Sequence, residues 1–165
     1  MDRLFPIEVE TLARLVLEEA RTRGWRIAAA ESCTGGLVAA SLTEIAGSSD
    51  VFERGFVTYS NRAKSELLDV PGDLIADFGA VSEPVARAMA EGALINSTAH
   101  LTVAVTGVAG PGGGSPMKPV GTVHFATAVA NGPIRHCEER FGDLGRSQVR
   151  LKSLIRALEL LRERL

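Results

Sequence analysis

Residues 25–42 join a short run of small apolar residues to a polar, glycine-containing turn and then to a second apolar run. The first run, at 25–30, predicts a buried strand, and the second predicts a helix that extends to about Ile45. Between them, residues 31–36 place a carboxylate, two hydroxyls and a thiol in four consecutive positions. The start of a helix leaves N–H groups unpaired and carries a partial positive charge. We therefore expect this strand-to-helix turn to be the active centre.

Helical and strand patterns alternate through the first two-thirds of the chain and then give way to a hairpin. Apolar residues recur at helical spacing at 7–23, 61–68, 83–96 and 146–164, with a short helical piece near 74–78. Runs of β-forming residues predict further strands at 51–60, 101–105, 120–129 and 134–141, the last two joined by an Asn-Gly turn. This order predicts an α/β fold, a three-layer α/β/α sandwich. Its mixed, mostly parallel sheet has about five strands and ends in an antiparallel hairpin.

The composition restricts the partners that we expect. The 165 residues fit one domain, and a net charge of −2 gives no electrostatic sign of nucleic-acid binding. No apolar run approaches the ~20 residues of a membrane span, and the first residues do not resemble a signal peptide. Two cysteines and three histidines show no disulfide or metal-ligand pattern, so we expect a cytoplasmic protein without a metal site. Small α/β enzymes often pair about a two-fold axis, so we expect a homodimer.

Three polar or glycine-rich loops follow the predicted strands, at residues 31–36, 59–64 and 106–115. In open α/β sheets, ligands collect beyond the carboxyl ends of the strands. These three loops should therefore meet at one site.

Ser32 is the first candidate nucleophile, and a serine hydroxyl needs a base. No histidine lies in the strand-end loops, whereas Lys64 falls one turn into the helix that follows the second strand. We predict a serine–lysine pair, in which burial or a nearby cation keeps the lysine amine neutral at about pH 7. Tyr59 and Ser60 are candidates to relay a proton or to hold the amine. The competing interpretations are a helix N-cap for Ser32 and a solvated surface side chain for Lys64.

Other residues of these loops each allow two interpretations. Cys33 is either a rival nucleophile or a small buried apolar side chain. Glu31 either binds a ligand or accepts hydrogen bonds from backbone N–H groups, and we favour the second. The glycine-rich loop at 106–115 either binds a phosphate or is a flexible connection, and it lacks the spacing of a Walker A motif. Arg146 and Arg150 either add charge at a phosphate or lie on the exposed face of the last helix.

Five stretches of the chain, in this order, resemble the CinA C-terminal domain family of competence/damage-inducible proteins. They are 31–36 (ESCTGG), 58–64 (TYSNRAK), 79–83 (GAVSE), 106–114 (TGVAGPGGG) and 118–123 (KPVGTV). The resemblance spans nearly all of residues 1–165, which we therefore interpret as a single domain of this type. One difference is that the stretch GDLGR, which ends at Arg146, is longer than the Gly-Asp-Arg typical of the family.

The resemblance implies an activity, because stand-alone bacterial members of this family include nicotinamide-nucleotide amidases. These enzymes hydrolyse the carboxamide of nicotinamide mononucleotide to nicotinate mononucleotide and ammonia, in pyridine-nucleotide salvage. The implied partner is this small-molecule pyridine nucleotide, and no metal or organic cofactor is implied.

The resemblance also assigns roles to residues. The family's catalytic serine falls on Ser32, its lysine on Lys64 and its tyrosine on Tyr59. Backbone N–H groups of the turn would hold the oxyanion of the tetrahedral intermediate, and the glycine-rich loop would hold the substrate phosphate. The residues expected to bind substrate are Glu31, Thr34, Gly35, Gly36, Asn61, Thr106, Gly107, Gly110, Gly112, Gly113, Gly114 and Arg146.

Two other functions fit the same residues. The first is a hydrolase that acts on another amide or on a pyrophosphate, although pyrophosphate hydrolysis normally uses a divalent metal ion. The second is a non-catalytic nucleotide-binding or regulatory module. Such a module would bind the mononucleotide tightly without turning it over.

Overall fold

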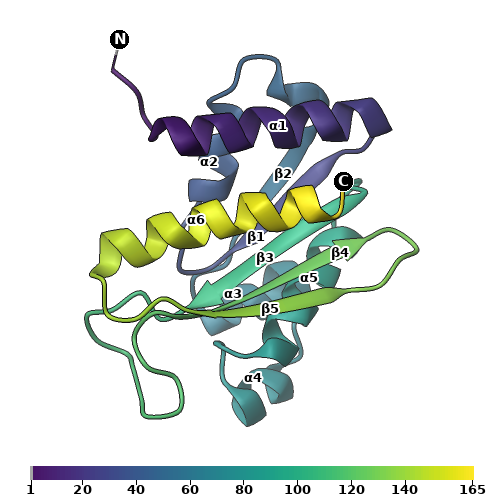
Figure 1. Cartoon of the computed structure of the whole chain (residues 1–165). Helices are drawn as coiled ribbons and strands as arrows, with labels where there is room; N and C mark the ends of the chain where they lie inside the picture. The colour runs from purple at the N-terminus through teal and green to yellow at the C-terminus, as the bar shows by residue number, and fades with distance from the viewer. Residues whose placement is uncertain (1) are drawn as a thin grey trace.

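A single five-stranded sheet forms the centre of the computed structural model, which describes residues 2–165 (Figure 1). The strand order is β2-β1-β3-β4-β5. The strands are β1 (Ile27–Glu31), β2 (Phe52–Val57), β3 (Leu101–Gly107), β4 (Thr122–Val129) and β5 (Arg135–Arg140). β1 is parallel to β2 and β3, whereas β4 is antiparallel to both β3 and β5. All strands except β4 therefore point the same way, which confirms the mixed, mostly parallel sheet and its terminal hairpin.

Helices cover both faces of the sheet (Figure 1). On one face lie α1 (Ile7–Arg23), α2 (Leu37–Thr43) and α6 (Arg146–Glu163). On the other lie α3 (Asn61–Leu68), α4 (Gly72–Phe78) and α5 (Glu83–Ile95). Each face has its own cluster of buried apolar side chains, which confirms the three-layer sandwich. Within residues 2–165, no helix is both long and apolar enough to cross a bilayer.

The predicted element boundaries shift where capping or pairing decides them. The strand predicted at 51–60 ends at Val57, because Ser60 is the N-cap of α3 and accepts a hydrogen bond from the Ala63 N–H at 3.0 Å. Asn61 is the first helical residue of α3. Ser82 is the N-cap of α5 and accepts a hydrogen bond from the Val85 N–H at 3.4 Å.

Strand pairing also moves boundaries. The first strand begins at Ile27, two residues later than predicted, and includes Glu31. β3 runs on to Gly107, because this residue still pairs with Val123 of β4. The helix after the central turn ends at Thr43, and a short 3₁₀-helix η1 (Ser48–Asp50) that was not predicted follows it.

The topology brings the ends of four strands to one edge. β1 lies between β2 and β3, and the pairing continues past its end. The Ser32 N–H donates to the Val105 carbonyl at 2.9 Å, and the Thr58 N–H donates to the Glu31 carbonyl at 2.8 Å. Because β5 points the same way, α6 also begins at this edge, beside the loop that follows β3 (Figure 1).

Gly92 sets how closely α5 approaches α3, the helix that carries Lys64. A Cβ at Gly92 would lie 1.9 Å from the Leu68 carbonyl oxygen, so only glycine allows these helices to pack at this distance. Gly92 therefore contributes to the close packing of α5 against α3.

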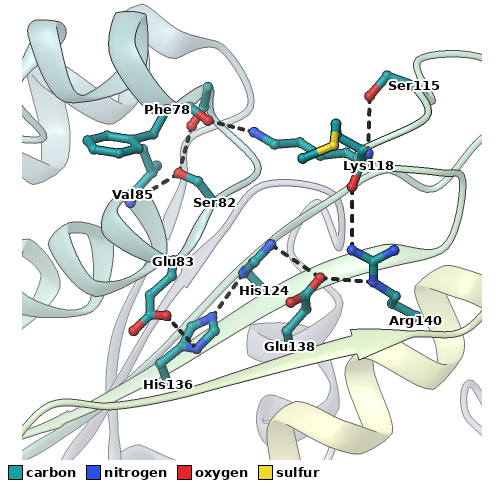
Figure 2. Close-up of polar contacts among 12 residues, drawn as sticks. Phe78, Ser82, Glu83, Val85, Ser115, Lys118, His124, His136, Glu138 and Arg140 are labelled. Atoms are coloured by element: carbon teal, nitrogen blue, oxygen red, sulfur yellow. Dashed lines mark hydrogen bonds and ion pairs between the residues drawn. The ribbon is translucent and has the colours of Figure 1, made fainter.

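A chain of titratable side chains links the hairpin to the start of α5 (Figure 2). His124 Nδ1 lies 2.9 Å from His136 Nε2, and His136 Nδ1 lies 3.4 Å from Glu83 Oε1. At the other end, His124 Nε2 lies 3.9 Å from Glu138 Oε1. Two facing ring nitrogens share one proton, so this arrangement requires that the two rings are not both protonated.

Acidification should destabilise the fold through this histidine chain. Burial lowers the pKa of both His124 and His136, so the native state favours the neutral rings, although Glu83 and Glu138 oppose the shift. Two cations, Arg87 and Lys118, reinforce it. The stabilisation is complete above the unfolded-state pKa of about 6.5 and is lost as the pH falls through the lower native values.

Urea unfolding at about pH 7.5 and about pH 5.5 measures this loss. The wild-type protein should lose more stability than His136→Gln, in which one ring of the pair no longer titrates. His100 is present in both proteins and cancels in the comparison. Equal losses would show that the histidine pair does not contribute.

Candidate active site

The turn after β1 and the first turn of α3 bring a serine and a lysine together. Lys64 Nζ lies 2.9 Å from Ser32 Oγ and 2.9 Å from the Thr58 carbonyl oxygen. Ser32 is 8% exposed and Lys64 is 1% exposed. The two residues are 32 positions apart in the sequence. They become neighbours because Ser32 follows β1, Lys64 lies in the helix that follows β2, and these two strands are adjacent in the sheet.

The environment of Lys64 disfavours its charged form. Burial lowers the pKa of its amine, partly opposed by the nearby Cys33. Among residues 2–165, no Asp or Glu forms an ion pair with it. A buried amine without an anionic partner is shifted towards the neutral state that a general base requires.

The hydrogen-bond geometry suits proton transfer from serine to lysine. The Thr58 carbonyl can only accept, so one N–H of the amine points to it. The lone pair of the neutral amine is then available to the Ser32 hydroxyl, at a distance that a general base needs.

Cys33 has the properties of a packed apolar side chain. It is 5% exposed, and burial raises the pKa of its thiol to about 12, so the thiol stays protonated. It belongs to the same hydrophobic cluster as α1 and α6. This geometry favours Ser32 as the nucleophile.

Glu31 supports the turn from inside and does not reach the pocket. Its two carboxylate oxygens accept hydrogen bonds from the Val38 and Ala39 N–H groups at 2.9 and 3.1 Å, in the first turn of α2. This is the second of the two interpretations given for Glu31, and it removes Glu31 from the residues expected to bind substrate. An acidic side chain at a helix N-terminus is stabilising in itself.

Several other residues expected to bind substrate also lie outside the pocket. Thr34 is fully buried, and neither Gly35 nor Gly36 lines the cavity. Among the N–H groups of the turn, that of Gly35 donates to the Ser32 carbonyl at 3.0 Å and is not free to hold an oxyanion. Gly114 faces a neighbouring surface hollow.

The pocket itself has a volume of about 290 Å³, at the lower end of the roughly 300–1,000 Å³ of small-molecule sites. No Asp or Glu lines it, and its fixed charge comes from Arg146. The expected site residues that line it are Ser32, Tyr59, Asn61, Lys64, Thr106, Gly107, Gly110, Gly112, Gly113 and Arg146.

Arg146 and Tyr59 close one side of this pocket together. Arg146 Nη1 donates to the Gly110 carbonyl at 2.8 Å, and Arg146 Nη2 donates to the Tyr59 hydroxyl at 2.9 Å. Tyr59 is 62% exposed and has no hydrogen bond to Ser32 or Lys64. The expected proton relay through Tyr59 therefore has no hydrogen-bonded path in this structure.

The glycine-rich loop presents unused backbone donors. The N–H groups of Gly110, Gly112 and Gly113 donate to no acceptor among residues 2–165. Clustered backbone N–H groups of this kind suit an anion. The end of the loop is anchored by Lys118, whose Nζ donates to the Phe78 carbonyl (Figure 2).

The prediction missed one wall of the pocket. Ala80 and Val81 line it, and Thr106 Oγ1 donates to the Ala80 carbonyl at 2.9 Å. The signal was present in the sequence, because residues 79–83 form one of the five recognised stretches, but nothing local indicates that they approach β3.

Fold and site together define a three-layer α/β protein with a buried serine–lysine pair at the carboxyl ends of its parallel strands. The model of the family described as "CinA C-terminal domain" matches residues 9–165. The chain belongs to this family, as its five stretches predicted.

Curated and solved relatives agree with this assignment. The CinA-like proteins of Synechococcus sp. (strain RCC307) and Anaeromyxobacter dehalogenans (strain 2CP-C) are 52% and 48% identical, each over 98% of this chain. The chain spans 39% of the length of each of these two relatives.

Two solved structures resemble almost the whole chain. The competence/damage inducible protein CihA from Agrobacterium tumefaciens is 52% identical, with a TM-score of 0.96 and 98% of both chains covered. The competence-damaged protein (CinA) superfamily protein from Escherichia coli is 32% identical, with a TM-score of 0.91, covering 99% of this chain and 95% of that one.

Proposed function

We propose that this protein hydrolyses the carboxamide of nicotinamide mononucleotide, giving nicotinate mononucleotide and ammonia. The observation that carries the proposal is the buried Lys64 amine 2.9 Å from the Ser32 hydroxyl, since this pair supplies both the nucleophile and its base. The family resemblance suggests this particular amide.

In the proposed reaction, neutral Lys64 takes the proton of Ser32 as Oγ attacks the carboxamide carbon. The resulting oxyanion is held by the backbone N–H of Cys33, which lines the pocket and has no acceptor among residues 2–165. Lys64 then returns its proton to the leaving nitrogen, the C–N bond breaks and ammonia departs. Water hydrolyses the Ser32 ester by the same sequence in reverse.

Substrate charge fits the pocket at both ends. The pyridinium ring is cationic, so it would lower the pKa of the neighbouring Lys64 further and make the carbonyl more electrophilic. The phosphate would meet the guanidinium of Arg146 and the unused N–H groups of the glycine-rich loop. A pocket without carboxylates suits this anionic end.

Arg146→Met should raise the KM for nicotinamide mononucleotide about 10- to 100-fold and change kcat little, because a charge-assisted contact to the phosphate is removed. Initial-rate kinetics measure both constants. Arg62→Met is the matched control, because Arg62 is an exposed arginine of α3 that pairs with Glu66 outside the pocket. A fall in kcat at constant KM would place Arg146 at the reacting carbonyl instead.

The proposal is tested by measuring ammonia release over a panel of nicotinamide mononucleotide, nicotinamide riboside, nicotinamide and a simple aliphatic amide. The mononucleotide should be the best substrate, and nicotinate mononucleotide should form in equal amount. Intact-mass analysis during turnover should find an adduct on Ser32 equal to the substrate minus ammonia.

The same assay separates the alternatives. Tight binding of the mononucleotide without ammonia release would support a binding module, and release that a chelator abolishes would support a metal-dependent hydrolase. Among residues 2–165, no group of three or more His, Cys, Asp or Glu side chains is arranged to hold a metal ion, so the geometry does not favour the latter.

A further inference from the structure

Arg150 lies behind the nucleophile turn and contacts it directly. It is one helical turn beyond Arg146 on α6, but its side chain takes a different direction. Its Nε donates to the Cys33 carbonyl at 3.0 Å and its Nη2 donates to the Thr34 carbonyl at 3.3 Å. Arg150 does not line the pocket and forms no ion pair with a carboxylate among residues 2–165.

The guanidinium lies close against the turn because of Gly35. A Cβ at this position would lie 3.3 Å from Arg150 Nη2, and the φ of +57° is one that side chains rarely adopt. Both the backbone conformation at position 35 and the close approach of Arg150 therefore favour glycine there.

The contact decides the orientation of the peptide groups next to Ser32. In a trans peptide the C=O and the following N–H point in opposite directions. With the Thr34 carbonyl held towards Arg150, the Gly35 N–H points away from it and donates to the Ser32 carbonyl at 3.0 Å. This bond fixes the Ser32 carbonyl, so the Cys33 N–H of the same peptide points the opposite way, and it has no acceptor among residues 2–165. Cys33 lines the pocket.

The positive charge also acts along the hydrogen bonds of the turn. A cation at the Thr34 carbonyl strengthens the Gly35 N–H as a donor to the Ser32 carbonyl, and this bond in turn strengthens the Cys33 N–H as a donor. Donors that are already oriented before the reaction stabilise a developing oxyanion without further rearrangement.

We propose that Arg150 is a positioning residue, which holds residues 32–35 so that the unpaired Cys33 N–H group receives the oxyanion. The proposal rests on the proposed function only in taking Ser32 as the nucleophile. It differs from a phosphate contact, because Arg150 acts through the backbone and never touches substrate.

The test compares Arg150→Met and Arg150→Lys with Lys152→Met, which removes an exposed cation from the same helix. For the mononucleotide, Arg150→Met should lower kcat about 100-fold, with KM within about three-fold of wild type. Arg150→Lys should recover part of the loss, since an ammonium reaches one carbonyl and lacks the fork. Lys152→Met should match wild type.

A second readout does not depend on the natural substrate. A fluorophosphonate probe forms a Ser32 Oγ–P bond and releases fluoride, and its labelling rate should fall in parallel with kcat. The amide ¹H and ¹⁵N shifts of Cys33 and Thr34 should change in both Arg150 variants and not in Lys152→Met. These measurements also apply to Arg150→Lys if Arg150→Met folds poorly.

Each other result overturns a specific claim. Increased KM with unchanged kcat and unchanged probe labelling would make Arg150 a phosphate contact, against this proposal. Equal labelling of wild type and Arg150→Met would also overturn it. A wild-type protein that the probe labels but that releases no ammonia would overturn the proposed substrate and leave the labelling comparison valid.

Discussion

Ser32→Ala should lower the rate of ammonia release from nicotinamide mononucleotide by at least about 10⁴-fold, the scale on which loss of the nucleophile acts in serine hydrolases. The reason is that the proposed ester forms on the Ser32 hydroxyl, which the variant lacks. The neighbouring thiol of Cys33 is buried, with its pKa raised to about 12. The variant should still bind the mononucleotide, because the loop and Arg146 are untouched.

Cys33→Ala is the matched control for this experiment, since it removes the rival nucleophile one residue away. It should keep most of the activity and should still form the Ser32 adduct. Coupled spectrophotometric detection of ammonia and titration calorimetry measure the rate and the affinity. Full activity in Ser32→Ala, or an adduct on Cys33, would rule out the proposed mechanism.

Lys64→Met should reduce kcat by about 10³-fold or more, because general-base catalysis typically contributes about 10²- to 10⁴-fold and here also sets the protonation of the leaving group. Methionine keeps most of the buried volume and removes the amine. In the wild-type protein, activity should rise with pH through the pKa of Lys64, which burial lowers. The residual activity of the variant should lack this rise.

The stability of Lys64→Met relative to wild type should depend on pH in a defined direction. Because the native pKa of Lys64 is lowered, there is a pH range in which the unfolded chain binds a proton at Lys64 and the native protein does not. In that range the difference in proton binding destabilises the native state, and the effect decreases as the pH rises. The wild-type protein should therefore gain stability relative to the variant as the pH rises towards the unfolded-state value of about 10.4. Urea unfolding at several pH values measures this trend. A pH-independent difference would mean that Lys64 stays charged in the native state.

Local signals allowed most of the fold to be predicted. The spacing of apolar residues in α1 (Ile7–Arg23) gave both of its ends, with Gly24 in the left-handed conformation after it. The Asn-Gly dipeptide marked the hairpin correctly. Most boundary errors fell at strand ends, because strand length depends on a neighbouring strand that the local sequence does not contain.

The candidate site was partly predictable for the same reason. Ser32 and Lys64 each follow a strand, and the rule that parallel strands end at one edge was enough to place them together. The hydrogen bonds of Glu31 with the start of α2 match the interpretation that the sequence favoured. The contact between Arg150 and the turn was not predictable in this way, because Arg150 is 116 residues from Thr34.

The sequence by itself determined the order of helices and strands, the polar turn at 31–36 and the family, because these depend on residue type and spacing along the chain. The tertiary structure decided the environment of each of those side chains. Burial shifts the pKa of Lys64 downward and that of Cys33 upward, and both shifts come from desolvation by residues distant in sequence. Desolvation depends on three-dimensional packing, so no local pattern could distinguish a buried lysine with a lowered pKa from a surface lysine.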